Sequence, residues 1–436
     1  MPSSPAADLP SEAGGLDVRP FRALTYRQHD PSTLARVSSP AYDLVTAAGR
    51  DQLAAADPHN IVRLILPHVE RTVGDGTGPA TDGAGSAATA AGTLEEWLTR
   101  GILDRDPQPA LWRYEMATPS SAPTTGWLGA VTLPRPGSSA VLPHEDTFAP
   151  AVEGRRALLA ATHTDLEPIV LAHDPDDEVT ALTRTAGSST PTLQVTDPDG
   201  VTHRLWRVTD PAVLDRLVRA LGRTQAVIAD GHHRFAAARA HQRDDAADSG
   251  AVLALLTPMG RGGLQVRAIH RVVPDLDLDS ALAIAGAGFQ VVDRTPADGN
   301  VTAVVEAWTA TGGRGAFLVT DGTGVAELTC PTAAVLDAVP AQAPAAWRGL
   351  DVVLAHHGLF GALWGRPDDP RSVLVAHDVA EALRLARERA GLAVLLHSPS
   401  PSDVAAVARA GARMPRKSTL FVPKPRTGLV LRPHAG

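Results

Sequence analysis

The fold is decided by the stretch Val227-Ile228-Ala229-Asp230-Gly231-His232-His233-Arg234-Phe235. Its apolar residues 227–229 predict a buried strand, and the Ala-rich residues 232–242 predict a helix directly after it. Gly231 permits the backbone dihedrals of a tight turn and lets a ligand approach the main chain. Strands and helices alternate along the rest of the chain as well, so the sequence predicts an α/β protein.

The first turn of the predicted helix is a candidate phosphate site. Its N–H groups and the positive end of the helix dipole attract anions, and Arg234 adds a guanidinium suited to phosphate oxygens. Asp230 could accept a hydroxyl proton or hold a metal-bound water. His232 and His233 lie about 100° apart on a helix, so we expect each to have its own task, phosphate contact or proton transfer. The alternatives are a helix N-cap beside a solvated basic face, and a metal site that joins one histidine to another carboxylate.

The composition excludes several classes of protein. A chain of 436 residues predicts two or three domains. The net charge of −8 provides no basic field for nucleic acid or anionic lipid, so neither is an expected partner. The single cysteine, Cys330, excludes an intramolecular disulfide framework and a Cys-x-x-Cys redox pair. With no signal-peptide pattern and no apolar run of 18 residues, we expect a cytoplasmic protein without a membrane span. The oligomeric state stays open.

The pattern along the chain predicts four parts. These are a disordered tail over 1–16, a core over 17–275, a small α/β module over 276–345 and a C-terminal α/β segment over 346–436. Within the core, the apolar run 61–66 predicts a buried strand, and the Gly/Ala/Thr-rich residues 73–92 predict a loop. Residues 419–422 and 428–431 predict a hairpin.

Further polar residues lie in or beside apolar stretches. His144 and Glu145 are candidates for acid–base chemistry or metal ligation, with a polar surface loop as the alternative. Arg63 is either ion-paired within the protein or an anion ligand. The remaining candidates, each with a structural role as the alternative, are Tyr42, Asn60, His270 and Arg271 for the substrate and Lys417 for phosphate. The sequence has no P-loop, no Gly-x-Ser-x-Gly elbow and no His-Glu-x-x-His motif.

Asp230-Gly231-His232-His233-Arg234 resembles the signature of the family catalogued as domain of unknown function 1015. The resemblance extends along nearly the whole chain. Its other pieces are Arg19-Pro20-Phe21-Arg22-Ala23-Leu24, Ser39-Pro40-Ala41-Tyr42-Asp43, Pro58-His59-Asn60-Ile61-Val62-Arg63-Leu64, Leu142-Pro143-His144-Glu145, Ile269-His270-Arg271, Met414-Pro415-Arg416-Lys417-Ser418-Thr419, Pro423-Lys424 and Gly428-Leu429-Val430. These pieces are specific to the family and imply little about its chemistry.

The strand, the Asp-Gly turn and the helix are also similar to the ParB/sulfiredoxin superfamily, which includes free L-serine kinases with an Asp-Gly-His-His-Arg string. This similarity, carried by residues 230–242, implies a ParB/sulfiredoxin-like core. It implies a base-like or metal-linked role for Asp230 and a phosphate cradle made by residues 231–234. A Glu upstream of the motif acts in those kinases, and Glu145 matches it by residue type alone. Sulfiredoxins carry Gly-Cys-His-Arg, whereas His232 stands in place of that cysteine here, which disfavours the redox branch.

The leading hypothesis is a phosphotransferase of serine metabolism. It would move a phosphoryl group from ATP or ADP, with Mg²⁺, to a small hydroxy compound such as free L-serine. Asp230 would act on the hydroxyl with help from Glu145 or His144. Two alternatives stay open. One is a phosphatase for a small phosphate ester such as phosphoserine, and the other is a nucleotide-binding regulatory protein without turnover.

Overall fold

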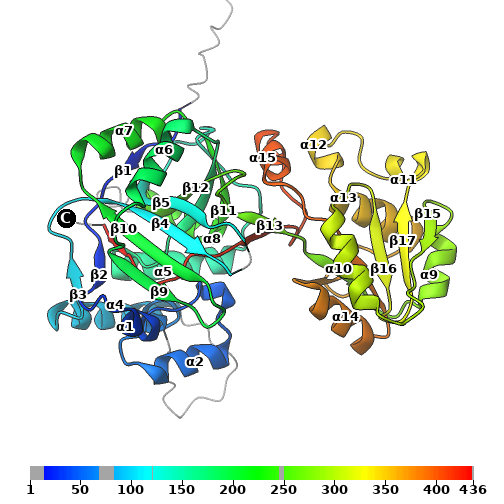
Figure 1. Cartoon of the computed structure of the whole chain (residues 1–436), viewed down its shortest axis with the longest axis horizontal. Helices are drawn as coiled ribbons and strands as arrows, with labels where there is room; N and C mark the ends of the chain where they lie inside the picture. Colours follow the sequence, from blue (N-terminus) through cyan, green and yellow to red (C-terminus); the bar gives the residue numbers. More distant parts are fainter. Residues whose placement is uncertain (1–13, 68–82, 120, 245–249, 435–436) are drawn as a thin grey trace, which may run out of the picture. The chain divides into compact units, whose positions relative to one another are not determined.

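The computed structural model describes residues 14–67, 83–119, 121–244 and 250–434 (Figure 1). Helices and strands occur together throughout, and the predicted α/β class is confirmed. Most of the predicted tail, residues 1–13, lies outside the described residues, and Leu16 at its end is buried. The chain divides into a first unit (Met1–Pro143, Thr147–Leu264 and Pro423–Gly436) and a second unit (His144–Asp146 and Gln265–Val422).

The first unit contains the longer sheet. Its strands are β1 (Val18–Arg19), β2 (Leu24–Tyr26), β3 (Leu103–Arg105), β4 (Leu111–Ala117), β5 (Thr124–Thr132), β6 (Val141–Leu142), β7 (Thr164–Asp165), β8 (Ile169–His173), β9 (Leu193–Thr196), β10 (Thr202–Val208), β11 (Ala226–Asp230), β12 (Ala251–Pro258) and β21 (Arg432–Pro433). Its helices are α1 (Pro31–Val37), η1 (Tyr42–Leu44), α2 (Ala47–Ala56), α3 (Val62–Ile65), α4 (Gly83–Thr99), α5 (Ala149–Thr162), α6 (Asp177–Ala186), α7 (Pro211–Leu221) and α8 (His232–Asp244).

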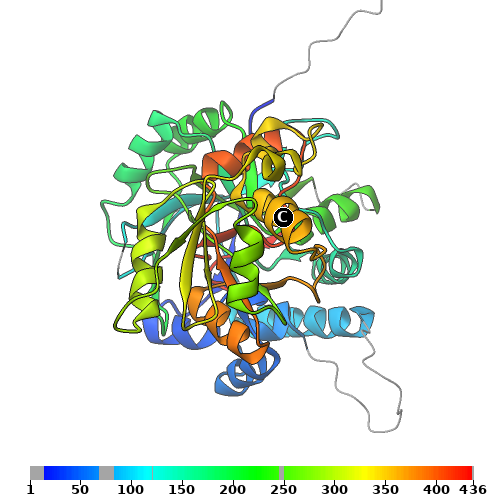
Figure 2. The same cartoon turned by 90° about the vertical axis from the view of Figure 1, so that its right-hand side faces the viewer.

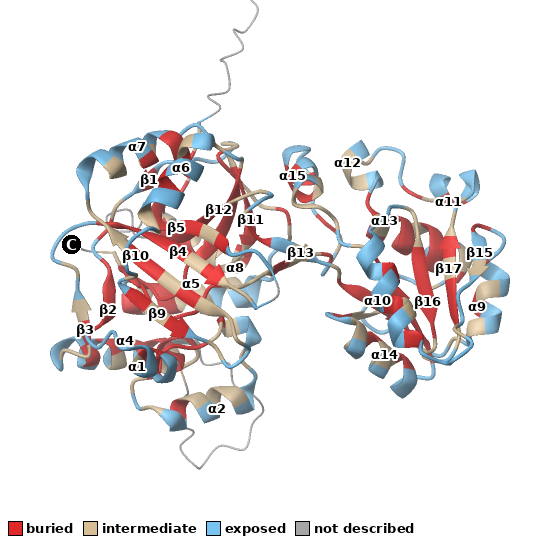
Figure 3. Cartoon of the chain, in the orientation of Figure 1, coloured by how far each residue is buried: buried red, intermediate tan, exposed pale blue. Residues whose placement is uncertain are grey.

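Among the described residues of this unit, nine strands form a mixed sheet. The order is β6-β11-β8-β12-β5-β4-β10-β9, and β1 pairs with β5. Strand β12 runs parallel to β8, whereas β11 runs antiparallel to β8. In β12, Leu253 and Leu255 on one face and Ala254 and Leu256 on the other are all fully buried. Figure 3 shows this burial along the strands, and it explains why the strand sequence is a continuous apolar run.

Helices on the first unit close its core around the β11–α8 junction. Phe235 and Ala238 of α8 and Leu159 of α5 join the same apolar cluster as Ile169 of β8 and Ile228 of β11. Residues from α6 and α7 complete this cluster. The junction between β11 and α8 is therefore held on both sides by buried apolar contacts.

Two predictions for the first unit are wrong. Residues 61–66 were expected as a strand, but Val62–Ile65 form helix α3, because an apolar run buried all round carries no period that separates helix from strand. The loop predicted over 73–92 lies partly outside the described residues, and from Gly83 onward the chain is helix α4 (Figures 1 and 2). Its small buried residues Ala87 and Ala90 continue the stripe of Leu94 and Trp97.

The hairpin predicted for 419–422 and 428–431 is also wrong. Strand β20 (Leu420–Val422) pairs antiparallel with β13 (Gln265–Arg267). Leu431 instead forms a bridge with Leu24. The two apolar runs therefore pair with distant parts of the chain and not with each other.

The second unit contains a six-stranded sheet in which every pairing is antiparallel, in the order β15-β17-β16-β19-β14-β18. It draws strands from both of the later segments predicted from the sequence. Its elements are β13, β14 (His270–Val273), α9 (Leu278–Ala285), β15 (Gln290–Asp293), α10 (Val301–Thr311), β16 (Phe317–Thr320), β17 (Val325–Thr329), α11 (Ala333–Asp337), α12 (Ala345–Arg348), α13 (Asp351–Leu354), the π-helix η2 (Ala355–Leu363), β18 (Leu374–Ala376), α14 (Val379–Glu388), β19 (Leu392–Leu395), α15 (Pro401–Arg409) and β20. No helix in the described part of the chain is long and apolar enough to cross a membrane.

The C-terminal residues of the first unit pair with a buried carboxylate. Arg432 Nε donates to Asp165 Oδ2 at 2.7 Å, and its Nη2 donates to the carbonyl of Ala251 at 2.6 Å. The N–H of Leu253 donates to the same carboxylate oxygen at 2.8 Å. Asp165 thereby joins β7, β12 and β21, which are distant in sequence.

We expect Arg432→Met to destabilise the first unit by about 3–5 kcal/mol, because it leaves the buried carboxylate of Asp165 without its cation. Chemical denaturation followed by circular dichroism measures the change. Arg135→Ala, at an exposed position, is the control. The double variant Asp165→Asn/Arg432→Met should recover part of the loss. Equal stability of Arg432→Met and the unmodified chain would contradict this account.

Candidate functional site

The turn between β11 and α8 has the geometry that only glycine accommodates. Gly231 has a φ of 93°. A Cβ atom at this position would lie 2.8 Å from Cγ2 of Ile169 and 3.1 Å from Nη2 of Arg234. The pairing of β11 with β8 also shifts register between Ile228 and Asp230. These features place the Asp230 carboxylate and the start of α8 side by side.

Asp230 lies between two cations. Arg234 Nη2 donates to Asp230 Oδ2, and Lys424 Nζ donates to Asp230 Oδ1 at 2.8 Å. Lys424 also contacts the carboxylate of Asp43. Arg234 Nη1 donates to the carbonyl of Pro168 at 2.6 Å, which fixes the guanidinium beside the turn. Residues 43, 230, 234 and 424 form one charge network, called the Asp230 network below.

Within the Asp230 network, Asp230 and Lys424 stabilise each other's charged form. Burial alone raises the pKa of Asp230, but the charges of Arg234 and Lys424 more than offset this, and the pKa lies below its ordinary value. Burial lowers the pKa of Lys424, yet Asp230 and Asp43 raise it above its ordinary value. An ionised aspartate beside a helix start can accept a hydroxyl proton, and the two cations can contact phosphate oxygens.

Tyr42 and Glu167 extend this site. The Arg155 guanidinium lies over the Tyr42 ring, with Cζ 3.8 Å from the ring centroid, and Arg234 Cζ is 5.5 Å from it. Glu167 Oε1 accepts from the N–H of Tyr42 at 3.1 Å and from Thr427 Oγ1 at 2.8 Å. Burial raises the pKa of Tyr42, so its phenol stays protonated at neutral pH.

Charges in the site balance. The carboxylates are Asp43, Glu167 and Asp230, and the cations are Arg155, Arg234 and Lys424. The contact between Lys424 and Asp43 is the more accessible one, because the Asp43 side chain is 39% exposed and that of Asp230 is 16% exposed. An incoming anion can therefore replace Asp43 on Lys424 while Asp230 stays paired.

The described residues do not form a protein site for Mg²⁺. They contain no group of three or more His, Cys, Asp or Glu placed to hold a metal ion. The two neighbouring carboxylates, Asp43 and Asp230, already share the ammonium of Lys424. Mg²⁺ prefers oxygen ligands in octahedral geometry, so this donor set does not fit the ion.

A cavity of about 50 Å³ adjoins Arg234 and Glu167 on the buried side. Sites for drug-sized ligands are about 300–1,000 Å³, so this cavity has room for water molecules only. A nucleotide would have to approach from the exposed side of the Asp230 network, where Asp43 lies.

The two histidines of the turn differ in their surroundings. His232 is buried, with 6% of its surface exposed, and its charge would act on Asp230. His233 Nε2 accepts from the N–H of Phe148 at 3.1 Å, so a neutral ring carries its proton on Nδ1. The separate tasks expected for the two histidines stay predictions.

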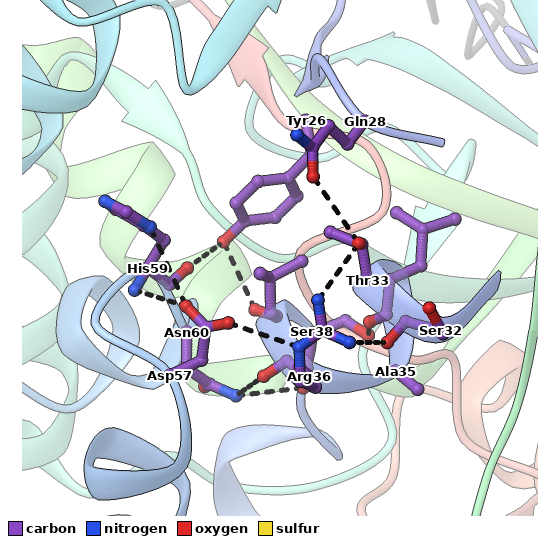
Figure 4. A network of polar contacts seen from close by, with 12 residues as sticks. Tyr26, Gln28, Ser32, Thr33, Ala35, Arg36, Ser38, Asp57, His59 and Asn60 are labelled. Carbon is purple, nitrogen blue, oxygen red and sulfur yellow. Dashed lines mark hydrogen bonds and ion pairs between the residues drawn. The ribbon is translucent and has the colours of Figure 1, made fainter. Parts of the chain in front are cut away.

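Asn60 and Arg63 of the first unit bond to nearby backbone. Asn60 is fully buried, and its Nδ2 donates to the carbonyls of Arg36 at 2.6 Å and Ser38 at 3.2 Å (Figure 4). Its Oδ1 accepts from the N–H of Val62 and so caps α3. Arg63 Nη2 donates to the carbonyl of Ala54 at 2.7 Å. These contacts give Asn60 and Arg63 a structural role in the fold. Their roles in binding substrate and phosphate stay predictions.

Five predicted site residues belong to the second unit. His144 Nε2 lies 3.1 Å from Thr419 Oγ1, which in turn donates to Glu145 Oε1 at 3.2 Å. Lys417 is exposed, with a positive φ of 50°. Arg271 has no exposed surface, and His270 is 4% exposed. The roles predicted for these residues in the chemistry of Asp230 stay predictions.

Arg271 bonds within the second unit. Its Nε donates to His356 Nε2 at 2.9 Å and its Nη2 donates to the carbonyl of Arg416 at 3.0 Å. His356 Nδ1 therefore carries the ring proton and faces Asp368 Oδ1 at 3.1 Å. This chain of contacts holds the segment that carries Lys417.

The sequence did not single out Lys424, Asp43, Arg155 or Glu167 as site residues. Lys424 lies 194 positions from Asp230, so no local pattern connects the two. One signal was available, since Lys417 and Lys424 are the chain's two lysines beside 38 arginines. A lysine ammonium is a compact charge with three donors, which suits a position between two carboxylates.

The chain matches the family described as "Protein of unknown function (DUF1015)" over residues 18–353. It belongs to this family, as the motifs predict. Lys424 lies beyond the matched residues. No curated protein matches the chain.

Solved structures show only distant similarity. A conserved hypothetical protein from Pyrococcus furiosus is 12% identical, with a TM-score of 0.29, over 65% of this chain and 87% of the other. A free serine kinase in complex with AMP is 13% identical, with a TM-score of 0.29, over 65% and 83%. SbnI with a C-terminal truncation from Staphylococcus aureus is 10% identical, with a TM-score of 0.32, over 68% and 82%. These values are too low to support an argument about function.

The two lysines allow a direct test of the Asp230 network. In protein labelled with ¹³C at lysine Cε, we expect the Lys424 signal to titrate above the ordinary lysine pKa, because Asp230 and Asp43 stabilise the ammonium. Asp230→Asn removes one of these carboxylates and should lower the pKa of Lys424. The Lys417 signal is the internal reference, since no described carboxylate pairs with Lys417. An unchanged Lys424 titration in Asp230→Asn would show that the pair does not form.

Proposed function

We propose that this protein is a nucleotide-dependent phosphotransferase that acts on a small hydroxy compound, with free L-serine as the first substrate to test. One observation carries the proposal: an ionised aspartate, a lysine and an arginine meet at the glycine turn that starts α8. The motif resemblance at residues 230–234 supports the same chemistry. Phosphoryl transfer depends mostly on positioning and on charge stabilisation, and this network offers both.

In the proposed reaction, the substrate hydroxyl oxygen bonds to the terminal phosphorus of ATP or ADP. The bond from that phosphorus to its bridging oxygen breaks, and the shorter nucleotide leaves. Asp230 accepts the hydroxyl proton. Lys424 and Arg234 offset the charge on the transferred phosphoryl group, and the first turn of α8 offers its N–H groups.

The proposed nucleotide contacts follow from accessibility. Phosphate oxygens would replace Asp43 on Lys424, because that carboxylate is the exposed partner. Mg²⁺ entering with the nucleotide would have phosphate oxygens as its ligands, and no step is assigned to a protein-held metal ion. We also propose a cytoplasmic location, because ATP and ADP are found there. The free cysteine Cys330 has no disulfide that would require an oxidising compartment.

The assay incubates the full chain with L-serine, Mg²⁺ and ATP or ADP, and separately with phosphoserine alone. We expect O-phosphoserine only in the presence of nucleotide. Asp230→Asn should reduce the rate by about 10²–10⁴, the usual contribution of a positioned base. Lys424→Met should reduce it by about tenfold or more through the lost charge-assisted hydrogen bond. Arg135→Ala is the control.

Other outcomes decide between the alternatives. Phosphate released from phosphoserine without nucleotide indicates the phosphatase. A shift of the Lys424 signal on adding ATP, without product, indicates a binding protein. If Lys417→Met loses activity and Lys424→Met keeps it, the phosphate contact belongs to the second unit. That result would overturn the assignment to the Asp230 network.

A further inference from the structure

The second unit holds a cavity that the proposed phosphotransfer does not use. It measures about 210 Å³ and is bordered by Arg267, His270, Asp378, His397 and Ser398 among others. It lies at one edge of the six-stranded sheet, where β14 begins and where β18 and β19 end. The start of helix α14 also borders it.

His270 directs an N–H group without a partner toward this cavity. Only 4% of the residue surface is exposed. Its Nδ1 accepts from the N–H of Leu396 at 3.3 Å, so the proton of the neutral ring is on Nε2. Within the described residues, no group accepts a hydrogen bond from this Nε2–H. The Nε2–H is therefore available to water or to a bound acceptor in the cavity.

The ring of His270 is neutral at physiological pH. Burial and the neighbouring charge of Arg271 lower its pKa to about 4, against the opposing effect of Asp378. The Nε2–H therefore acts as a fixed neutral donor rather than as a titrating charge. A neutral donor attracts the lone pair of an oxygen and does not ligate a metal through this nitrogen.

A second histidine forms a rigid side of the cavity. The His397 ring stacks on Trp308, with the ring centroids 3.8 Å apart and the planes inclined by 22°. Trp308 Nε1 donates to Glu327 Oε1 at 2.9 Å, which fixes the stack. Trp308 belongs to helix α10 and His397 follows strand β19, so the stack connects this side of the cavity to the core of the second unit.

Arg267 and Asp378 carry the formal charges at the cavity. Arg267 is exposed and makes no hydrogen bond or ion pair with any described residue. Asp378 is the carboxylate on the cavity, and its Oδ1 accepts from the N–H of Glu381 as the N-cap of α14. The backbone N–H of His377 donates to Glu381 Oε2 at 2.7 Å, and Nδ1 of His377 lies 3.2 Å from the same oxygen. The Arg267 guanidinium and the Nε2–H of His270 are two donors at the cavity without an acceptor among the described residues.

We propose that this cavity binds a small oxyanion, a carboxylate or a phosphate, between Arg267 and His270. Its volume is below that of sites for drug-sized ligands, so the occupant is a small molecule or a single group of one. The guanidinium supplies charge and a forked pair of donors, and the imidazole fixes one oxygen. The proposal is independent of the phosphotransfer proposed for the first unit.

The test uses the full chain labelled with ¹⁵N-histidine and titrated with phosphate or with acetate at constant ionic strength. We expect a saturable shift of the His270 signal with at least one of the two anions, and the two arms distinguish phosphate from carboxylate. Arg267→Ala should weaken binding roughly ten- to hundredfold, the effect of losing a charge-assisted hydrogen bond. Arg371→Ala, at an exposed position of the same unit, is the matched control and should bind normally.

His270→Asn assigns the signal and tests the donor. The Asn carbonyl can replace Nδ1 as acceptor for Leu396, while the Nε2–H is removed, so isothermal titration calorimetry should show weakened binding in a folded chain. The Lys424 signal reports on the first unit alone. Failure of the anion site and failure of the proposed phosphotransfer can therefore be distinguished. The proposal is overturned if neither anion shifts His270, or if Arg267→Ala binds as tightly as the unmodified chain.

Discussion

Charge pairing between three aspartates, one buried and two half-buried, and the residues of 423–434 is the constraint on which the first unit depends. Lys424 pairs with Asp230, Arg426 with Asp197 and Arg432 with Asp165. A buried carboxylate without a partner costs several kcal/mol, and each of these cations therefore stabilises the ionised form of its aspartate. Arg426 also donates to Ser38 Oγ at 2.6 Å, which brings the N-terminal residues into the same set of contacts. The candidate site is thus one of several places where this segment completes the first unit.

The Asp230 network combines a structural and a chemical property. Each member is held by another, and the charges of the carboxylates and cations balance before any ligand arrives. Under the proposed function, an anion would bind by exchange of one carboxylate for another negative group and not by neutralising an excess of positive charge. Because Asp43 is the exposed carboxylate, the exchange can occur without uncovering Asp230. The −8 net charge of the whole chain fits such a local arrangement.

Local signals predicted the centre of the site, and long-range contacts supplied the rest. The strand, glycine and helix around Asp230 follow from neighbouring residues, and Tyr42, which the family motif also contains, lies beside Arg234. The sequence did not connect Lys424 with Asp230 or Glu167 with Tyr42, because these partners are far apart in sequence and lie in no pattern with a period. The strand expected at 61–66 is a helix, since an apolar run buried all round has no polar face to reveal its period. Small alanines likewise concealed the amphipathic stripe of α4.

The connectivity also determines when the first unit can become stable during synthesis. The ribosome makes residues 265–422 before it makes the segment that neutralises Asp165, Asp197 and Asp230. At about 5–20 residues per second, this interval lasts on the order of ten to thirty seconds. During this interval the nascent first unit lacks these three cations, while the second unit has its own sheet and core to fold on. The order of folding is therefore expected to be the reverse of the order in which the two units begin.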